Sequence, residues 1–366
     1  MAGSTPSCAT GSLALGHVLV IGGCGFLGSH IVRMLLSEPS CTAISVVSRN
    51  PTTNTFPSVN YHAGDISNSV RVKALITELQ PRVVIHTSSP RVTSKPALLH
   101  ATNIIGTTNL LKCAAETPSV RAFVYTSSDS ALHPSNKMMN EETCILYTAE
   151  DTKAIAYQRT KAIADAMVLD ANSETLRTAT LRLPMVYGEG DPYVIMPALE
   201  QLRKGENKVQ VGNNTTLRDS LYVGSAASAH ILAAKALLRG IRDPNAPKVD
   251  SEAFLLSDGE VLPFYDFMRK CWRAAGDKSD AKDVKVIPMW VAMSITGVTE
   301  WLYWIFTAGM KEPAMKREVL AYLERGVWFD ITKAEERLGY RPLVTVDEGI
   351  RRSMKWALEE ERKKSD

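Results

Sequence analysis

The sequence predicts an α/β fold, a doubly wound parallel sheet followed by a smaller C-terminal lobe. Three observations carry this prediction: short β-branched runs alternate with helical stretches, several runs are apolar on both faces, and the first run ends in three spaced glycines that open a helix. Buried parallel strands have this two-sided apolar character, and repeated strand–helix–strand units build a doubly wound sheet. With 366 residues, 45% of them hydrophobic, the chain is long enough for a sizeable core.

Six apolar runs are predicted to form the strands of this sheet. They are 17–22, 43–48, 59–65, 82–87, 122–128 and 178–183. Helical patterns lie between them, for example at 69–80 and 103–116. After about residue 190 helices dominate, interrupted by loops that contain Pro and Gly. We therefore expect the sheet in the first half of the chain and a helical lobe over its C-terminal edge.

The charge pattern argues against a nucleic-acid partner, because the net charge is only +3 and acidic and basic residues are interspersed. The six cysteines, at positions 8, 24, 41, 113, 144 and 271, form no C-x-x-C motif and have no histidine cluster beside them. We expect reduced thiols, no metal site and a cytoplasmic protein. Residues 1–16 lack the basic and apolar regions of a signal peptide, so we expect a flexible polar leader.

The stretch "HVLVIGGCGFLGSHIVRMLL", residues 17–36, places Gly22, Gly25 and Gly28 between a strand and a helix. Gly22 allows a tight turn, Gly25 lets the backbone approach a pyrophosphate, and Gly28 lets the helix pack closely on the strand. The free N–H groups at the helix N-terminus favour a phosphate. The pattern predicts a dinucleotide site, and the alternative is a turn with a structural role alone.

The second strand ends in "SVVSRNP", which bears on the choice of dinucleotide. Chains that bind NAD carry an acid here for the ribose 2′-OH, whereas this chain has Ser48 followed by Arg49. A hydroxyl and a guanidinium suit a 2′-phosphate, so NADP is favoured over NAD. The alternatives are that Arg49 is solvated or stacks on adenine. Asp65 and Ile66, after the third strand, are expected at the adenine, although "GDIS" also fits a helix cap.

The chemistry is predicted from "AIAYQRTKAIADAMVL", in which Tyr157 and Lys161 form Y-x-x-x-K. The i, i+4 spacing places both side chains on one face of a helix. A phenol has a pKa near 10, which a neighbouring ammonium lowers, so the tyrosine can exchange a proton with an alcohol or a ketone. Ser128 ends the fifth strand, at the sheet edge where a ligand is expected, and is placed to bind the reacting oxygen. The alternative is a core tyrosine with a surface lysine.

Several motifs together resemble the extended short-chain dehydrogenases/reductases, and within them the 3β-hydroxysteroid dehydrogenase branch. They are "GGCGFLGSH", "VVIHTSSP", "NIIGTTNLL", "FVYTSSDS", "AYQRTKA", "LRLPMVYGEGD", "VGNNTTLRDSLYVGSAASAHILAAKALL" and "ITKAEERLGYRPLVTVDEGI". The chain is most similar to the decarboxylating sterol-4α-carboxylate 3-dehydrogenases of this branch. Two departures are Ser48, where many relatives have an acid, and Leu183, which separates Arg182 from Pro184.

The resemblance implies a Rossmann domain and a set of site residues. Ser128, Tyr157 and Lys161 are the implied catalytic residues. The implied cofactor-binding residues are Gly22, Gly25, Phe26, Leu27, Gly28, Ser48, Arg49, Asp65, Ile66, Thr87, Ser88, Ser89, Asn103, Tyr157, Lys161, Pro184 and Val186. The implied domains are an NAD(P)-binding domain at 17–190, with 217–258 returning to it, and a substrate-binding lobe at 191–216 and 259–366. A homodimer through the helix of Tyr157 and its neighbour is also implied.

The resemblance implies oxidation of a 3β-hydroxyl on a sterol or terpenoid polycycle, with C4 decarboxylation through a β-keto acid. One alternative is a dehydrogenase or ketoreductase of specialised metabolism, acting on a meroterpenoid or triterpenoid. A different class is a dinucleotide sensor without catalysis, although such a protein is expected to have lost Tyr157 or Lys161.

The segment 289–310, "MWVAMSITGVTEWLYWIFTAGM", is apolar and aromatic. We expect a buried or pocket-lining helix here. The alternative is peripheral contact with a membrane surface through exposed Trp and Phe, which would place the protein on the cytosolic face of the endoplasmic reticulum membrane. A spanning helix is disfavoured because Glu300 lies in the middle of the segment.

Overall fold

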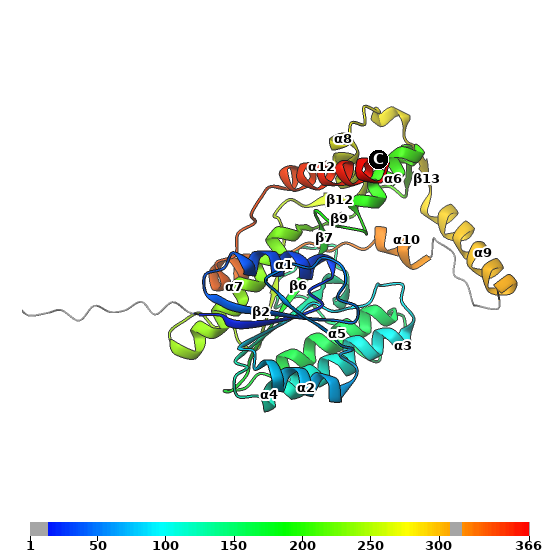
Figure 1. The fold of residues 1–366 in the computed structure, drawn as a ribbon. Coiled ribbons are helices and arrows are strands. Elements are labelled where there is room, and N and C mark those ends of the chain that lie inside the picture. The colour runs from blue at the N-terminus through cyan, green and yellow to red at the C-terminus, as the bar shows by residue number, and fades with distance from the viewer. Residues whose placement is uncertain (1–13, 308–316, 366) are drawn as a thin grey trace, which may run out of the picture.

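The computed structural model describes residues 14–307 and 317–365 (Figure 1). Most of the predicted leader, with Cys8, lies outside the described residues, as do residues 308–310 of the apolar segment. The five other cysteines are free thiols. These are Cys24, Cys41, Cys113, Cys144 and Cys271.

A seven-stranded parallel sheet forms the centre of the molecule, in the order β11-β6-β5-β4-β1-β2-β3. The strands are β1 Gly16–Ile21, β2 Cys41–Ser48, β3 Asn60–Ala63, β4 Val83–His86, β5 Ala122–Ser128, β6 Arg177–Leu183 and β11 Glu252–Leu255. The first six confirm the six predicted runs. The seventh, β11, is not among those runs and joins the edge beside β6. The order reverses between β1 and β4, and a crevice at such a point is where ligands bind in this type of sheet.

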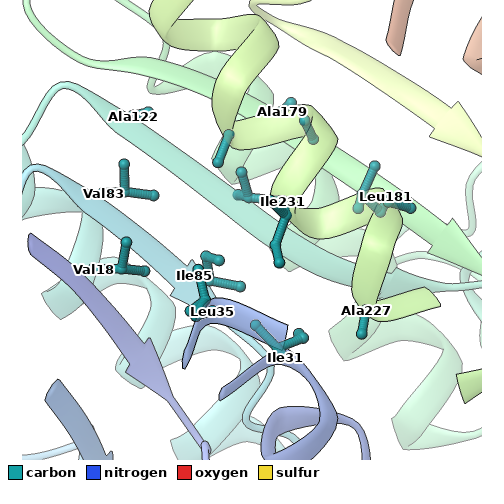
Figure 2. Close-up of a cluster of buried hydrophobic side chains, with 14 of the residues drawn as sticks. Val18, Ile31, Leu35, Val83, Ile85, Ala122, Ala179, Leu181, Ala227 and Ile231 are labelled. Atoms are coloured by element: carbon teal, nitrogen blue, oxygen red, sulfur yellow. The ribbon is translucent and has the colours of Figure 1, made fainter. Parts of the chain in front are cut away.

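Helices cover both faces of the sheet, which makes the fold doubly wound (Figure 1). On one face lie α1 Phe26–Leu36 and α7 Val223–Arg242, and on the other α2 Ser69–Leu79, α4 Thr107–Glu116 and α5 Ala156–Asp170. Figure 2 shows the core between the strands and the first pair, where branched side chains of β1, β4 and β6 meet those of α1 and α7. The alanine-rich face of α7 allows this close approach. The helix α11 Thr332–Leu338 joins the same core.

The helix before β5 is continuous but changes its pitch. A short helix α3 Pro96–Leu99 runs into a π-helical segment η1 His100–Gly106 and then into α4. The sequence predicts only a helix here. Wider π-turns inside helices are frequent at functional sites because they turn one side chain out of the regular register. The residue concerned is Asn103, which is fully buried.

The second lobe has its own apolar core. Its main helices are α6 Ile195–Lys204, α8 Phe264–Ala274 and α12 Val346–Ser365. Three small two-stranded sheets accompany them: β7 Met185–Tyr187 with β10 Ser220–Tyr222, β8 Val209–Val211 with β13 Lys285–Ile287, and β9 Leu217–Arg218 with β12 Leu262–Pro263. The domain boundaries given above stay a prediction.

The apolar segment forms the helix α9 Met289–Thr307, which extends away from the body and is followed by α10 Arg317–Leu323 (Figure 1). Of the expected buried or pocket-lining helix, the buried form is wrong, whereas α9 does line a pocket, together with Arg317 of α10. Only Thr296 of α9 is buried, whereas Trp290, Trp304 and Phe306 are 74%, 67% and 81% exposed. Hydrophobicity alone cannot tell a core helix from an exposed apolar one, because the difference lies in which elements pack against it. Among the described residues, no helix is long and apolar enough to cross a membrane.

Candidate active site

The glycine turn between β1 and α1 leaves no room for side chains. Gly22 has a φ of +85°, and a Cβ on it would lie 2.8 Å from Ser88 Oγ. A Cβ on Gly28 would lie 2.2 Å from the carbonyl oxygen of Gly22, so the helix can pack here only because this residue is glycine. Gly25 is the N-cap of α1 and provides no side-chain cap. The first N–H groups of α1 therefore remain available to an anion.

A cleft of about 550 Å³ opens at this turn. It is lined by nine of the predicted cofactor-binding residues: Gly22, Gly25, Ser48, Arg49, Asp65, Ile66, Thr87, Ser88 and Ser89. Six further lining residues are missing from the sequence prediction: Cys24, Val47, Asn50, Thr53, Gly64 and Thr102. Their signal in the sequence is only their position beside the turn and the strand ends.

The other predicted cofactor-binding residues do not line this cleft. Phe26 and Leu27 pack against the core of the second lobe, as does Val186. Gly28 lies beneath the turn, and Pro184 is buried after β6. Asn103, Tyr157 and Lys161 belong to the neighbouring side-chain network described below.

The end of β2 brings a hydroxyl and a guanidinium to the cleft. The Ser48 hydroxyl accepts a hydrogen bond from the Cys24 N–H at 3.4 Å, and Arg49 is exposed. The pKa of Asp65 is lowered chiefly by hydrogen bonds from Ser67, with a smaller contribution from the Arg49 charge. Asp65 does not cap α2. The expectation of a cap there is wrong, because Asn68 accepts the hydrogen bond from Arg71 N and occupies the N-cap position.

The three predicted catalytic residues come from two elements that pack together. Ser128 ends β5, and its hydroxyl donates to Asp129 Oδ1 and accepts from Ser130 N, both at 3.1 Å. It caps the short 3₁₀ turn η2 Asp129–Ala131, which packs against α5. Tyr157 lies in the first turn of α5 and is partly buried, and Lys161 follows one turn later.

Lys161 is 2% exposed, so the reading as a surface lysine is wrong. Its Nζ donates to the Tyr125 hydroxyl at 2.8 Å and to the carbonyl oxygen of Thr126. Burial lowers the pKa of Lys161 to about 7, although the charge of Asp165 opposes this shift. Tyr125 is missing from the sequence prediction. Its signal is its place three residues before Ser128 in "VYTSS", on the opposite face of the strand.

A chain of hydrogen bonds joins the cleft to α5. The Ser89 hydroxyl donates to Asn103 Oδ1, and Asn103 Nδ2 donates to Thr160 Oγ1, both at 3.0 Å. Thr160 in turn donates to the Tyr157 carbonyl oxygen at 3.2 Å. Asn103 therefore links the wall of the cleft to the helix of Tyr157, and the π-turn of η1 carries it.

These residues fit a nicotinamide dinucleotide. The glycine cradle admits a pyrophosphate where any Cβ would intrude, and the strand-end hydroxyls and Arg49 are polar groups suited to sugar and phosphate. Through Ser89, Asn103 and Thr160 the cleft is connected by hydrogen bonds to the helix that carries Tyr157 and the buried Lys161. A tyrosine and a lysine, with the nearby Ser128, are the groups that proton exchange with an alcohol requires. The fold and this site define the class of protein: a nicotinamide-dependent oxidoreductase with a Rossmann domain.

Comparisons with known proteins give the family. Residues 19–286 match the 3-beta hydroxysteroid dehydrogenase/isomerase family. The chain is 36% identical over 296 residues to the sterol-4-alpha-carboxylate 3-dehydrogenase, decarboxylating, of Gibberella zeae, covering 80% of this chain and 96% of that protein. It is 32% identical over 347 residues to the Schizosaccharomyces pombe protein of the same name, covering 94% and 98%. The chain belongs to the 3-beta hydroxysteroid dehydrogenase/isomerase family.

The solved structures add the fold. The UDP-glucose 4-epimerase of Thermotoga maritima superposes with a TM-score of 0.70 at 21% identity, covering 96% of this chain and 100% of that one. The Thermus thermophilus UDP-glucose 4-epimerase, in complex with NAD, superposes with a TM-score of 0.69 at 22% identity, covering 93% and 99%. These likenesses confirm the predicted extended Rossmann fold.

Proposed function

We propose that the protein oxidises the 3β-hydroxyl of a sterol-type polycycle that carries a C4 carboxylate, and that this carboxylate leaves as CO₂. The observation that carries the proposal is the buried Lys161 one turn after Tyr157 on α5, the helix that packs against the Ser128 turn and is linked by hydrogen bonds to the cleft. The relatives named as decarboxylating sterol-4-alpha-carboxylate 3-dehydrogenases support the substrate class.

In the proposed mechanism, Ser128 binds the C3 oxygen and Tyr157, as phenolate, removes its proton. Lys161 stabilises this phenolate when it is protonated, and its pKa near 7 allows it to change charge during turnover. A bound nicotinamide dinucleotide supplies the hydride acceptor. The resulting C3 ketone lies β to the carboxylate, so the electron pair of the breaking C4–CO₂ bond is taken up as an enolate, which is then protonated.

The cofactor we propose is NADP, with NAD as the alternative. Support comes from Ser48 and Arg49, both of which line the cleft at the end of β2, where a 2′-phosphate needs a hydroxyl and a cation. The carboxylate that lines the cleft after β3, Asp65, accepts hydrogen bonds from Ser67 N and Oγ.

We further propose a peripheral contact between α9 and a membrane surface, on the cytosolic face of the endoplasmic reticulum. The only charged residue of α9, Glu300, is paired with Arg317 of α10 at 2.7 Å, so the acid does not oppose contact with lipid. Exposed Trp and Phe side chains suit the interfacial region of a bilayer. A homodimer through α5 and its neighbour α4 is also proposed, and light scattering on the purified protein tests it.

The function is tested by incubating the protein with a 3β-hydroxy-4α-carboxy sterol and NADP⁺ or NAD⁺. Reduced cofactor is followed by absorbance and the product by mass spectrometry, with Tyr157→Phe as the control. The expected product is a 3-ketone that has lost one CO₂, and the variant should lose it while still binding dinucleotide. Oxidation only of polycycles without a carboxylate would instead support a role in specialised terpenoid metabolism. Dinucleotide binding without turnover of any substrate would support a sensor.

A further inference from the structure

Arg325 follows α10 in the chain and reaches the turn that carries Ser128. It is 7% exposed. Its Nη2 donates to the carbonyl oxygens of Asp129, at 2.6 Å, and of Leu132. Both carbonyls belong to the chain immediately after Ser128, which is the cap of the same turn. A guanidinium from a position almost 200 residues later in the sequence is therefore hydrogen-bonded to the turn that Ser128 caps.

The charge of Arg325 has no carboxylate partner among the side chains that the structure describes. The Asp129 carboxylate instead accepts from the hydroxyls of Ser128 and Ser130. One face of the guanidinium meets the ring of Tyr147, with its Cζ 5.9 Å from the ring centroid. Its Nε is buried and has no hydrogen-bond acceptor. A buried guanidinium without a counter-ion is energetically costly, which points to an anionic ligand.

We infer that Arg325 binds the carboxylate of the substrate and so determines specificity. This inference rests on the proposed function. In that substrate the carboxylate is attached to C4, the carbon next to the reacting C3. Once Ser128 holds the C3 oxygen, the carboxylate must lie close to the same turn. Arg325 is hydrogen-bonded to the carbonyl oxygen of Asp129, the residue that follows Ser128. Its planar guanidinium has the N–H donors that bind a carboxylate.

The inference explains how the site distinguishes substrate from product. A substrate with the C4 carboxylate supplies the missing counter-ion, whereas a sterol without it leaves Arg325 uncompensated. Removing the carboxylate as CO₂ also removes this contact from the product. Arg325 would therefore favour binding of the acid and release of the decarboxylated ketone.

The test compares Arg325→Gln and Arg325→Lys with the wild type on two substrates, the 3β-hydroxy-4α-carboxy sterol and the same sterol without the carboxylate. We expect Arg325→Gln to raise KM for the acid by about 30-fold or more and KM for the neutral sterol by less than about 3-fold. Arg325→Lys keeps the charge and should lie between. Dissociation constants of the acid, measured in a Tyr157→Phe background, should follow the same order. Dinucleotide affinity should not change.

Arg218 provides a matched control, because it is another buried arginine, 4% exposed, in the same region. It lies on β9 and forms a β-bridge with Val327, which is two residues after Arg325. Arg218→Lys should not discriminate between the two substrates. If Arg325→Gln weakens both substrates equally, Arg325 only supports the serine turn and the inference is wrong. The inference is also wrong if Arg218→Lys, and not Arg325→Gln, selectively weakens binding of the acid. If the wild type ignores the acid but oxidises the neutral sterol, both the proposed function and the inference fail.

Discussion

Lys161 shows how burial adapts one residue to its chemistry. In water its ammonium would be fully charged at neutral pH, whereas burial next to Tyr125 brings its pKa to about 7. The same burial raises the pKa of Tyr125 well above its usual value, and the neighbouring Asp165 and Tyr157 add to this shift. Tyr125 therefore stays a neutral hydrogen-bond partner of Lys161, which agrees with the proposal that Tyr157 exchanges the proton.

Gly28 allows a prediction about cofactor binding. Gly28→Ala places a Cβ where it would meet the Gly22 carbonyl at 2.2 Å, so the phosphate-binding turn must open. We expect dinucleotide affinity to fall at least ~10-fold, as measured by nicotinamide fluorescence titration. Gly240→Ala, in α7 with nothing within 4 Å of the added Cβ, is the control and should raise stability by up to ~1 kcal/mol. Unchanged affinity in Gly28→Ala would contradict the role of the turn.

Arg49 allows a prediction about cofactor choice. Arg49→Gln removes the guanidinium that we propose for the 2′-phosphate, and a hydrogen bond to a charged group contributes about 1.5–3 kcal/mol. We expect KM for NADP⁺ to rise ~10- to 100-fold while KM for NAD⁺ changes little. Lys73→Gln, an exposed cation on α2 away from the cleft, is the control. Equal effects of Arg49→Gln on the two cofactors would remove the case for NADP.

At the scale of elements, the packing of a strand or helix depends on partners far away in the sequence. β5 delivers Ser128 to the sheet edge, α5 presents Tyr157 and Lys161 to it, and η1 supplies Asn103 between them. Each of these elements has a clear local pattern, so their existence is predictable. α9 has an equally clear apolar pattern, but among the described elements its main packing partner is α10, and its aromatic side chains remain largely exposed.

The exposure of α9 leads to a prediction about lipid binding. A double variant, Trp304→Ser and Phe306→Ser, removes two of its most exposed aromatic side chains. We expect the wild type to sediment with phosphatidylcholine–phosphatidylserine vesicles and the variant to bind at least ~10-fold more weakly. Turnover of a detergent-solubilised substrate should be retained. Tyr193→Ser, an exposed aromatic outside α9, is the control. Equal sedimentation of the wild type and both variants would exclude α9 as the contact.

At the scale of the whole molecule, buried acids lie where the sheet edge meets the second lobe. Asp219 accepts hydrogen bonds from Ser257 Oγ and Phe329 N, and Asp258 accepts from Tyr222 N and Tyr187 OH. Burial raises the pKa of Asp219 to about 7 and that of Asp258 to about 6. These carboxyls connect segments next to the sheet with segments of the second lobe. Their ionisation is therefore expected to affect the stability of the whole fold.

Asp219 therefore predicts a pH-dependent stability. Its folded pKa, about 7, lies above the value of 3.8 for an exposed carboxyl, so between pH 4 and 7 the folded protein binds more protons than the unfolded chain. The contribution of this group to stability consequently falls as pH rises through that window. Asp219→Asn should lose this dependence. The unfolding free energy of the variant minus that of the wild type should be larger at pH 8 than at pH 5, by ~1 kcal/mol or more.

The measurement is the free energy of unfolding in urea at pH 5 and at pH 8. Asp170→Asn, at an exposed carboxyl, is the control and should change the two values equally. If Asp219→Asn shifts stability by the same amount at both pH values, the carboxyl does not titrate in this window.

The sequence by itself determined the six strands, the glycine turn, and the placement of Ser128, Tyr157 and Lys161 on their elements. The physical reason is that these features are local: side-chain periodicity, the steric freedom of glycine and i, i+4 spacing act within one or two turns of chain. The position of nine predicted cofactor-binding residues along the cleft is predictable in the same way, because they lie at or after strand ends.

Only the tertiary structure decided the rest. β11 becomes the seventh strand because β6 offers an open edge, and α9 is exposed because, among the described elements, α10 alone makes extensive contact with it. Lys161 is buried because β5 passes beneath α5 and presents Tyr125 to it. Arg325 reaches the serine turn across 196 residues of sequence. Such contacts depend on which distant surfaces meet, and burial and electrostatics then determine what each side chain can do.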